Sequence, residues 1–403
     1  MTMQKPLLTA TLVALCSGAA LGILNEALAG APIPLKGATG PVANGAIDEL
    51  QSGTPPQREM WSGGELAGAD PKDLTAASAE AVVQDGVAGQ RVVWHRDLEE
   101  AKRIAKKEGK HLLLDFTGSG WCGFCTKLHA EVFDHPDYAP GTEGDFVHVV
   151  LDFDAELRAR RDQPFAQQND RLREALKIEA FPTVLLMTAE GVAYESFPYR
   201  AGGAGPYMDR LLVAREKASV LEKNVPQIAG AVAGAKSAEQ AESAADEAML
   251  LLTQAGAHPL ARSLVPIVQT VMKAENVTPK REAAAVAALS AAEVVTKEVI
   301  DRAFRLDPRN SAGLPEAALA GAFRSIQDVD QVQELVDRSE ALRRAGPIFD
   351  VQRAAQLYGD CAYWSHNWLG DSDRAAVHAR FALSLEPKDP DLRAMLEGLS
   401  SGK

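Results

Sequence analysis

Cysteine is scarce in this chain, which has only four cysteines among 403 residues. A secreted protein held together by a disulfide framework would carry matched pairs spread along the sequence. Here Cys122 and Cys125 are separated by only two residues, and a bridge across them closes almost no loop. Because disulfide stabilisation through chain entropy grows with loop length, this pair is expected to serve chemistry rather than to staple the fold.

Basic residues are also in deficit, with 42 Lys and Arg against 55 Asp and Glu and a formal net charge of −13. Binding to a phosphate backbone needs clustered Lys and Arg, so no nucleic-acid partner is expected. An anionic membrane surface is disfavoured for the same reason. The sequence also lacks a phosphate-binding glycine loop in the right context and the local signatures of a Ser-His-Asp arrangement. The cysteine pair therefore remains the chief chemical motif.

The amino-terminal segment has the pattern of an export signal. Lys5 precedes an apolar run over residues 6–24, and the small residues of the Ala-Leu-Ala triplet at 27–29 fit a signal-peptidase site. We predict that residues 1–29 are a signal peptide and that the protein is periplasmic or secreted. Because the apolar run is close to the ~20 residues that a spanning helix needs, an uncleaved membrane anchor is the alternative.

The length allows two or three domains, because single cores usually stop growing well below this size. Residues 30–90 are rich in Gly, Pro, Ala, Ser and Asp and hold too few large apolar residues for a core, which predicts a disordered spacer. Residues 219–403 show no strand pattern, and their alanine-rich amphipathic stretches predict an all-α domain. Two segments, 302–310 and 380–390, resemble the end of a tetratricopeptide repeat, but their separation does not fit that period. Both a helical-hairpin array and an irregular bundle therefore stay open.

Residues 91–218 alternate between helical and strand periods. The segment 97–109 has apolar residues at helical spacing, acids early, lysines late and a closing glycine, all of which predict a helix. The other expected elements are strands at 111–116 and 145–154, a helix at 172–178, two strands joined at 189–191 and a closing helix. This order predicts an α/β domain in which helices cover a central mixed sheet.

The motif Trp-Cys-Gly-Phe-Cys lies where a buried strand ends and a helix begins. A helix start offers unpaired N–H groups and a favourable dipole to a negative sulfur, so Cys122 is the candidate nucleophile. Cys125 follows one turn later and can attack the mixed disulfide to release a substrate.

Two further residues complete a candidate site. Pro182 precedes an apolar strand, where a proline, often cis, can present an edge to an incoming peptide. Asp115 lies in an apolar run seven residues before Cys122, where a carboxylate can accept a proton from the resolving thiol through a water.

The segments LLLDFTGSGWCGFC, EVF, FVHVVLDFD and FPTVLLM occur in this order over residues 91–218. They resemble the thioredoxin superfamily, in particular an exported bacterial branch with a Thr-Gly-Ser-x-Trp-Cys-x-x-Cys signature. The resemblance implies a thioredoxin fold, Cys122 as attacking cysteine, Cys125 as resolving cysteine, Trp121 beside them and Pro182 as the cis-proline. It implies no cofactor beyond the redox-active disulfide.

The sequence departs from thioredoxin itself in two places. One additional residue separates Asp115 from Cys122, which weakens the transfer of the buried-carboxylate role to Asp115. The dipeptide between the cysteines is Gly123-Phe124, and this dipeptide helps to set the reduction potential. Because neither residue supplies a positive charge that would strongly stabilise a thiolate, a reductase is favoured over an oxidase.

The sequence thus predicts an exported thiol-disulfide oxidoreductase that acts on protein thiols and disulfides, receives electrons from an upstream donor and holds a partner on its helical domain. A rival prediction is a copper or zinc site formed by Cys122, Cys125 and His129, since Cys125 and His129 share a helix face. A third is a non-catalytic interaction protein that acts through the helical tail. The remaining Cys361 is expected to be a buried packing residue.

Overall fold

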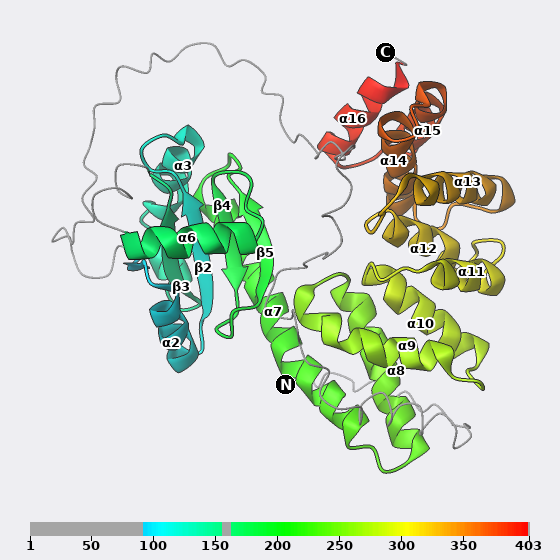
Figure 1. Cartoon of the computed structure of the whole chain (residues 1–403), viewed down its shortest axis with the longest axis horizontal. Helices are drawn as coiled ribbons and strands as arrows, with labels where there is room; N and C mark the ends of the chain where they lie inside the picture. Colours follow the sequence, from blue (N-terminus) through cyan, green and yellow to red (C-terminus); the bar gives the residue numbers. More distant parts are fainter. Residues whose placement is uncertain (1–91, 155–162, 402–403) are drawn as a thin grey trace, which may run out of the picture. The chain divides into compact units, whose positions relative to one another are not determined.

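The structure is a computed structural model that describes residues 92–154 and 163–401 (Figure 1). The expected signal segment and spacer lie outside the described residues. The described chain forms two compact units, one up to Ala218 and one from Ser219, and each is considered by itself. No helix in the described ranges is long and apolar enough to cross a bilayer.

The first unit is built on a mixed five-stranded sheet, as the sequence predicts (Figure 1). Its spatial order is β1-β3-β2-β4-β5, with β1, β3 and β2 parallel and with β4 and β5 antiparallel to their neighbours. The strands are β1 (Trp94–His95), β2 (His111–Thr117), β3 (Phe146–Asp152), β4 (Thr183–Met187) and β5 (Ala193–Pro198). The sequence does not predict the short strand β1, because two residues are too few to show the alternation of apolar and polar side chains that marks a strand.

One face of this sheet is covered by α2 (Leu98–Glu108) and α6 (Gln163–Ala175). Helix α2 begins where the Asp97 carboxylate caps two N–H groups and ends at Gly109, whose φ of 67° lies in the left-handed region. Alternate residues of β2, among them Leu114 and Phe116, join α2 in one apolar cluster. Asp115 between them therefore points to the opposite face.

The helix that carries the cysteines differs from the sequence expectation. The spacing of Phe124, Leu128 and Val132 predicted one continuous helix, but α3 (Gly123–Leu128) is followed directly by a π-helical turn, η2 (His129–Phe133). Leu128 and Val132 are buried, whereas Phe124 is 58% exposed. The predicted apolar stripe is therefore not buried at Phe124, because this residue lies at the surface in the first turn of the helix, beside the cysteines. Helices α4 (Tyr138–Thr142) and the start of α7 (Ala204–Ala233) complete this unit.

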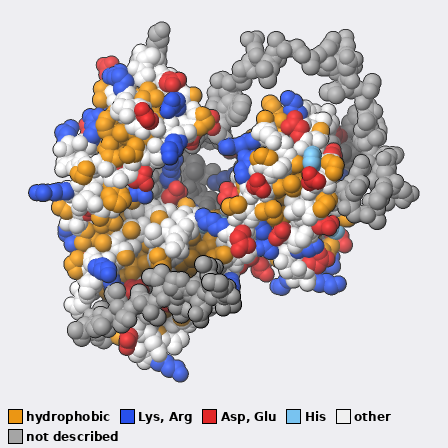
Figure 2. All heavy atoms as spheres, turned by 180° about the vertical axis from the view of Figure 1, so that it is seen from behind, with side chains coloured by type: hydrophobic (Ala, Val, Ile, Leu, Met, Phe, Trp, Pro, Cys, Tyr) orange, Lys and Arg blue, Asp and Glu red, His pale blue; other side chains and the backbone are white. Residues whose placement is uncertain are grey.

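The second unit is all-helical, as predicted, and consists of the end of α7 and the helices that follow (Figure 1). Helices α8, α10, α12, α14 and α16 pack on one another in succession, and α11, α13 and α15 return between them. The bounds are α8 (Ala238–Ala255), η3 (Pro259–Leu264), α9 (Val265–Lys273), α10 (Pro279–Ala291), α11 (Lys297–Leu306), α12 (Leu314–Ala322), α13 (Val329–Ala345), α14 (Val351–Asn367), α15 (Ser372–Ser384) and α16 (Pro390–Ser400). On the visible face, acidic and basic side chains are interspersed (Figure 2).

The helices α11, α13 and α15 are joined by a series of ion pairs, which we call the ion-pair ladder. Its three pairs each join residues 37 positions apart. They are Lys297 with Glu334, Asp301 with Arg338, and Asp337 with Arg374. The constant separation indicates that successive helical hairpins stack with a regular offset.

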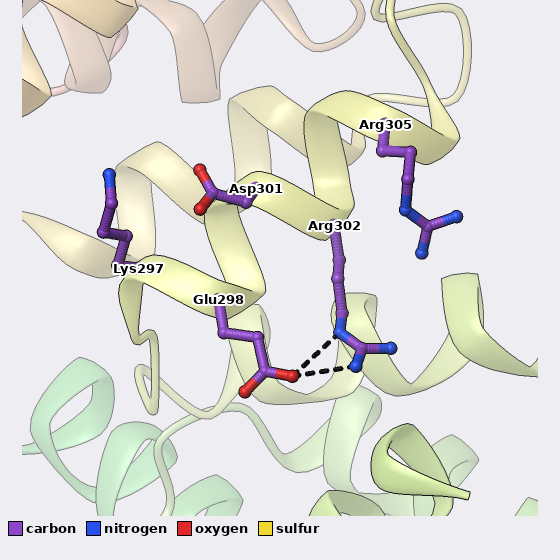
Figure 3. A pocket seen from close by; sticks show the side chains of 5 residues that line it. All are labelled: Lys297, Glu298, Asp301, Arg302 and Arg305. Atoms are coloured by element: carbon purple, nitrogen blue, oxygen red, sulfur yellow. Dashed lines mark hydrogen bonds and ion pairs between the residues drawn. The ribbon is translucent and has the colours of Figure 1, made fainter. Parts of the chain in front are cut away.

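A cavity of about 560 Å³ beside α11 belongs to the same network (Figure 3). Arg302, which lines it, bonds Glu298 at 2.8 Å and also contacts Glu282 of α10. Arg305 bonds Glu282 at 2.5 Å. Lys297 and Asp301, which also line the cavity, are paired with Glu334 and Arg338 in the ion-pair ladder. Every charged side chain that lines the cavity is therefore already paired.

Candidate functional site

The two cysteines form a disulfide at the start of α3. Cys122 is the N-cap residue, and the backbone N–H of Cys125 donates to its Sγ at 3.2 Å. Cys122 is 8% exposed and Cys125 only 1%. The first sulfur is thus the one that an incoming group can reach.

The loop before the cysteines is fastened to the end of β3. The backbone N–H and the hydroxyl of Ser119 bond the Asp152 carboxylate at 3.2 and 2.6 Å. A Cβ on Gly118 would lie 2.4 Å from the ring of Trp121, and one on Gly120 would lie 1.9 Å from an oxygen of Asp154. A larger residue at Gly118 or Gly120 would therefore require the Trp121 ring or the Asp154 side chain to move.

The loop before β4 meets the residue before the cysteines. The Phe181–Pro182 peptide bond is cis. The ring of Phe181 meets Trp121 edge-on at 5.4 Å, and Trp121 Nε1 donates to the carbonyl of Phe153 at 3.4 Å. The structure therefore brings together two segments that the sequence analysis had assigned to one site, although they lie about sixty residues apart.

Two exposed aromatic residues belong to the cysteine motif, Trp121 before Cys122 and Phe124 between the two cysteines. Trp121 and Phe124 are each 58% exposed. Phe124 approaches the ring of Tyr199 at 5.8 Å, and the hydroxyl of Tyr199 donates to Glu131 at 2.7 Å. The Tyr199 contribution was not foreseen, because this residue follows β5 and reaches the site only through the fold.

Asp115 is completely buried in β2. Its Oδ2 lies 2.7 Å from Nε2 of His129, the first residue of η2. Its Oδ1 is buried and has no hydrogen-bond partner among the described residues. A carboxylate with a partner on only one oxygen is unusual in a protein interior.

The surroundings of His129 favour its protonated form. Burial alone would lower the pKa of His129, but the hydrogen bond and the charge of Asp115, with smaller contributions from Asp134 and Asp152, raise this pKa above its usual value. The rings of Trp94 and Phe133 pack beside the imidazole at 5.8 and 5.0 Å. Sequence spacing placed His129 one turn after Cys125, but its contact with Asp115 crosses from helix to sheet and leaves no local signal.

The donors of the expected metal alternative are engaged with other partners. Cys122 and Cys125 are bonded to each other, and His129 Nε2 is bonded to Asp115. Over residues 92–154 and 163–401, no group of three or more His, Cys, Asp or Glu side chains is arranged to hold a metal ion.

Two further titratable groups, His148 and Cys361, are buried. His148 lies in β3 with Tyr138 hydroxyl at 3.2 Å, and burial lowers the pKa of His148 to about 3. Cys361 in α14 is a buried free thiol, as the sequence analysis predicts. Burial raises the pKa of this thiol to about 12. A thiol of this kind is not a nucleophile near neutral pH.

A mixed sheet with a dithiol at the start of a helix and a cis-proline loop beside it defines a domain of the thioredoxin-like class. Residues 98–198 match the family described as thioredoxin-like domain. The chain therefore carries a thioredoxin-like domain, in agreement with the resemblance found in its sequence.

Two curated relatives, both from Chlamydia pneumoniae, match this region. The thioredoxin-related protein DsbJ is 34% identical over 115 residues, which cover 28% of this chain and 31% of DsbJ. The disulfide bond reductase DsbH is 26% identical over 126 residues, which cover 31% of this chain and 74% of DsbH. A solved structure of a DsbH oxidoreductase covers 35% of this chain and 95% of its own, with 22% identity and a TM-score of 0.30. The match thus spans about a third of the length of DsbJ.

Proposed function

We propose that this protein is a thiol-disulfide oxidoreductase that exchanges electrons with protein disulfides through Cys122 and Cys125. The observation that carries the proposal is the asymmetric pair at the start of α3, with one reachable sulfur and one buried sulfur. The name of the DsbH relative, a disulfide bond reductase, favours electron flow from this dithiol to the substrate.

In the reductive direction, the Cys122 thiolate attacks one sulfur of the substrate disulfide, and the other substrate sulfur leaves as a thiolate that takes a proton from solvent. Cys125 then loses its proton and attacks the Cys122 sulfur. The bond between Cys122 and the substrate breaks, and the electron pair leaves with the substrate sulfur. Two electrons have passed to the substrate, and an upstream donor must return two electrons to the Cys122–Cys125 disulfide.

The start of α3 supports the thiolate at Cys122. The helix dipole favours negative charge at this end, and the Cys125 N–H already points at the Cys122 sulfur. No charge is contributed by Gly123 or Phe124, so the stabilisation stays moderate. A moderate stabilisation of the thiolate suits a reductase, because a strongly stabilised reduced form makes the disulfide an oxidant.

The exposed aromatic rings suggest the kind of substrate. Trp121 precedes Cys122, and Phe124 lies between the two cysteines. Their rings contact Phe181 and Tyr199 respectively. Rings of this kind contribute contact area at low cost in conformational entropy. We infer that the substrate is an extended protein segment with apolar side chains next to its disulfide.

The proposal is tested by reduction of insulin disulfides with the mature protein. We expect turnover that is lost in Cys122→Ser and unchanged in Cys361→Ser, since Cys361 is buried in the other unit. Equal rates for the wild type and Cys122→Ser would remove the catalytic claim. The direction is tested by the reduction potential of the pair, for which a reductase should lie below about −220 mV.

The helical unit is proposed to be a degenerate repeat array that holds a protein partner. The support for a repeat is the ion-pair ladder, in which three contacts recur at a separation of 37 residues. Export to the periplasm or beyond remains a proposal that rests on the first 29 residues of the sequence. Edman sequencing of the protein from a periplasmic fraction, expected to begin at Gly30, tests the cleavage.

A further inference from the structure

The proposed electron transfer assigns no role to the half-buried His129 imidazole, which bonds the buried Asp115 carboxylate. We propose that His129 is a positioning residue that acts through Asp115 to keep a proton behind the dithiol, and that it thereby favours the thiolate of Cys122. This inference rests on the proposed function and adds the regulation of its reactive sulfur.

The position of His129 on the cysteine-bearing helix relates this pair to Cys125. Cys125 and His129 are four residues apart, and the backbone N–H of His129 donates to the carbonyl of Cys125. Side chains at this spacing are neighbours on one helix face. His129 reaches Asp115 at 2.7 Å, and Asp115 lies on the sheet face opposite α2. The resolving cysteine and the pair therefore share one side of the sheet.

The charges around His129 come from three directions. Asp115 approaches from β2, Asp152 contributes from the end of β3, and Asp134 follows η2. Trp94 of β1 and Phe133 of η2 contribute only rings. The imidazole thus lies among acidic groups, and the rings packed on it lower the polarity on that side.

A buried carboxylate without a counter-charge would oppose a second negative charge on a nearby sulfur. The protonated His129 cancels the charge of Asp115, so that the pair is neutral overall. The thiolate of Cys122 then forms at lower pH than it would beside an uncompensated Asp115. Loss of the His129 charge should consequently stabilise the disulfide relative to the reduced dithiol.

Asp115 Oδ1 also has a place in the resolving step. When the Cys125 sulfur bonds to Cys122 and the substrate sulfur departs with its electron pair, the Cys125 proton needs an acceptor. As the sequence analysis expects, Asp115 can accept this proton through a water, and Oδ1 has the capacity for it while Oδ2 keeps its bond to His129. The proton passes on to solvent after the substrate has left.

The test compares variants of the full chain. His129→Gln keeps a hydrogen-bond donor but removes the charge, and His129→Lys restores a charge at the same position. His135→Gln is the matched control, because His135 is an exposed histidine six residues away. The readouts are the pH at which alkylation of reduced Cys122 by iodoacetamide is half-maximal and the equilibrium of the dithiol with glutathione.

For His129→Gln we expect the half-maximal pH to rise by about one unit and the equilibrium to move about tenfold toward the disulfide, which corresponds to about 30 mV more negative. His129→Lys should return both values toward those of the wild type, and His135→Gln should change neither. In an Asp115→Asn background, His129→Gln should have less than half of its effect.

The inference fails if His129→Gln leaves both readouts unchanged, or if His129→Lys does not differ from His129→Gln. Both readouts are measured without a protein substrate, so they are independent of insulin turnover. Loss of turnover in the wild type would overturn the proposed function alone. An unchanged alkylation profile beside normal turnover would overturn the role of His129 alone.

Discussion

Asp307 in the helical unit and Asp115 in the thioredoxin-like unit are buried carboxylates with opposite hydrogen bonding. In the helical unit, Asp307 accepts four hydrogen bonds, from the N–H and hydroxyl of Ser311 and from the N–H groups of Ala312 and Leu314. In the thioredoxin-like unit, Asp115 is buried more deeply, but only its Oδ2 has a hydrogen-bond partner among the described residues, and its Oδ1 has none. The first arrangement fixes a turn, whereas the second leaves capacity for a proton.

Glu316 follows the pattern of Asp307. Its carboxylate accepts from the backbone N–H groups of Phe349 and Asp350 and from the side chain of Asn310. It holds the loop between α13 and α14 against the start of α12. The comparison teaches that complete hydrogen bonding marks a structural acid, and that an incompletely bonded one beside a dithiol marks a functional acid.

Acid should separate the two units most strongly. His148 is buried and neutral with a pKa of about 3, and His378 in α15 is buried with a pKa lowered to about 4. Both pKa values lie below the pKa of a histidine in an unfolded chain, which is near 6.5. The stability that each neutral imidazole contributes is therefore fully present above pH 6.5 and is lost as the pH falls toward the pKa of that histidine in the folded protein. The expected loss is about 5 kcal/mol for His148 and about 3 kcal/mol for His378.

Hydrogen exchange of the full chain from pH 7 down to about pH 2.5, followed by mass spectrometry of separate peptides, measures this difference, because the two losses diverge only below the pKa of His378. Exchange rates are corrected for the intrinsic effect of pH. Residues 146–152 should lose protection before residues 372–384. The opposite order would show that burial of His148 does not govern the acid limit of the first unit.

The next largest effect is expected from Glu316→Ala. Three donors would lose their acceptor in a buried position, which should cost roughly 3 to 5 kcal/mol of unfolding free energy in the helical unit. The measurement is unfolding in urea, monitored by hydrogen exchange of the backbone amides of residues 349–367. Glu247→Ala on the exposed face of α8 is the control and should stay within 0.5 kcal/mol or so of the wild type.

Asp115→Asn should have the opposite effects to Glu316→Ala, with little change in stability and a loss of activity. Because the amide keeps an acceptor for His129 and removes one buried charge, the substitution should change stability by less than about 2 kcal/mol in either direction. Insulin reduction should slow, because the acceptor of the Cys125 proton is lost. Unfolding in urea and turnover are measured on the same preparation, and a loss of stability comparable to that of Glu316→Ala would break the contrast between the two acids.

The smallest effect belongs to the ion-pair ladder. Asp301→Asn removes an exposed partner of Arg338 and should cost less than about 1 kcal/mol. A double-mutant cycle with Arg338→Gln isolates the pair, and the coupling should shrink in 1 M salt, where charges are screened within about 3 Å. A coupling above 2 kcal/mol would mean that the ladder does more than align the hairpins.

Local chemistry made part of this structure predictable. Asp97 and Gly109 delimit α2 because a cap and a left-handed glycine act on adjacent residues. The mixed sheet and the strand-to-helix position of Cys122 and Cys125 follow from periodicity in the same way. Each of these features is written within a few residues of the sequence.

The remaining features depend on contacts between distant segments. The bond from His129 to Asp115 forms only when η2 packs on β2. The π-helical turn shifts the register after Leu128, and no residue type announces it. The ladder depends on how one hairpin settles on the next, which side-chain spacing within a single helix cannot encode.

The depth of Cys125 has a practical consequence. Since its sulfur is almost inaccessible, any covalent adduct with a client must form on Cys122 and can be released only from within. A chain with Cys125→Ser would lack this internal release and would keep its clients attached. The burial of one sulfur atom thus makes the protein a covalent bait, from which its natural clients can be recovered and identified.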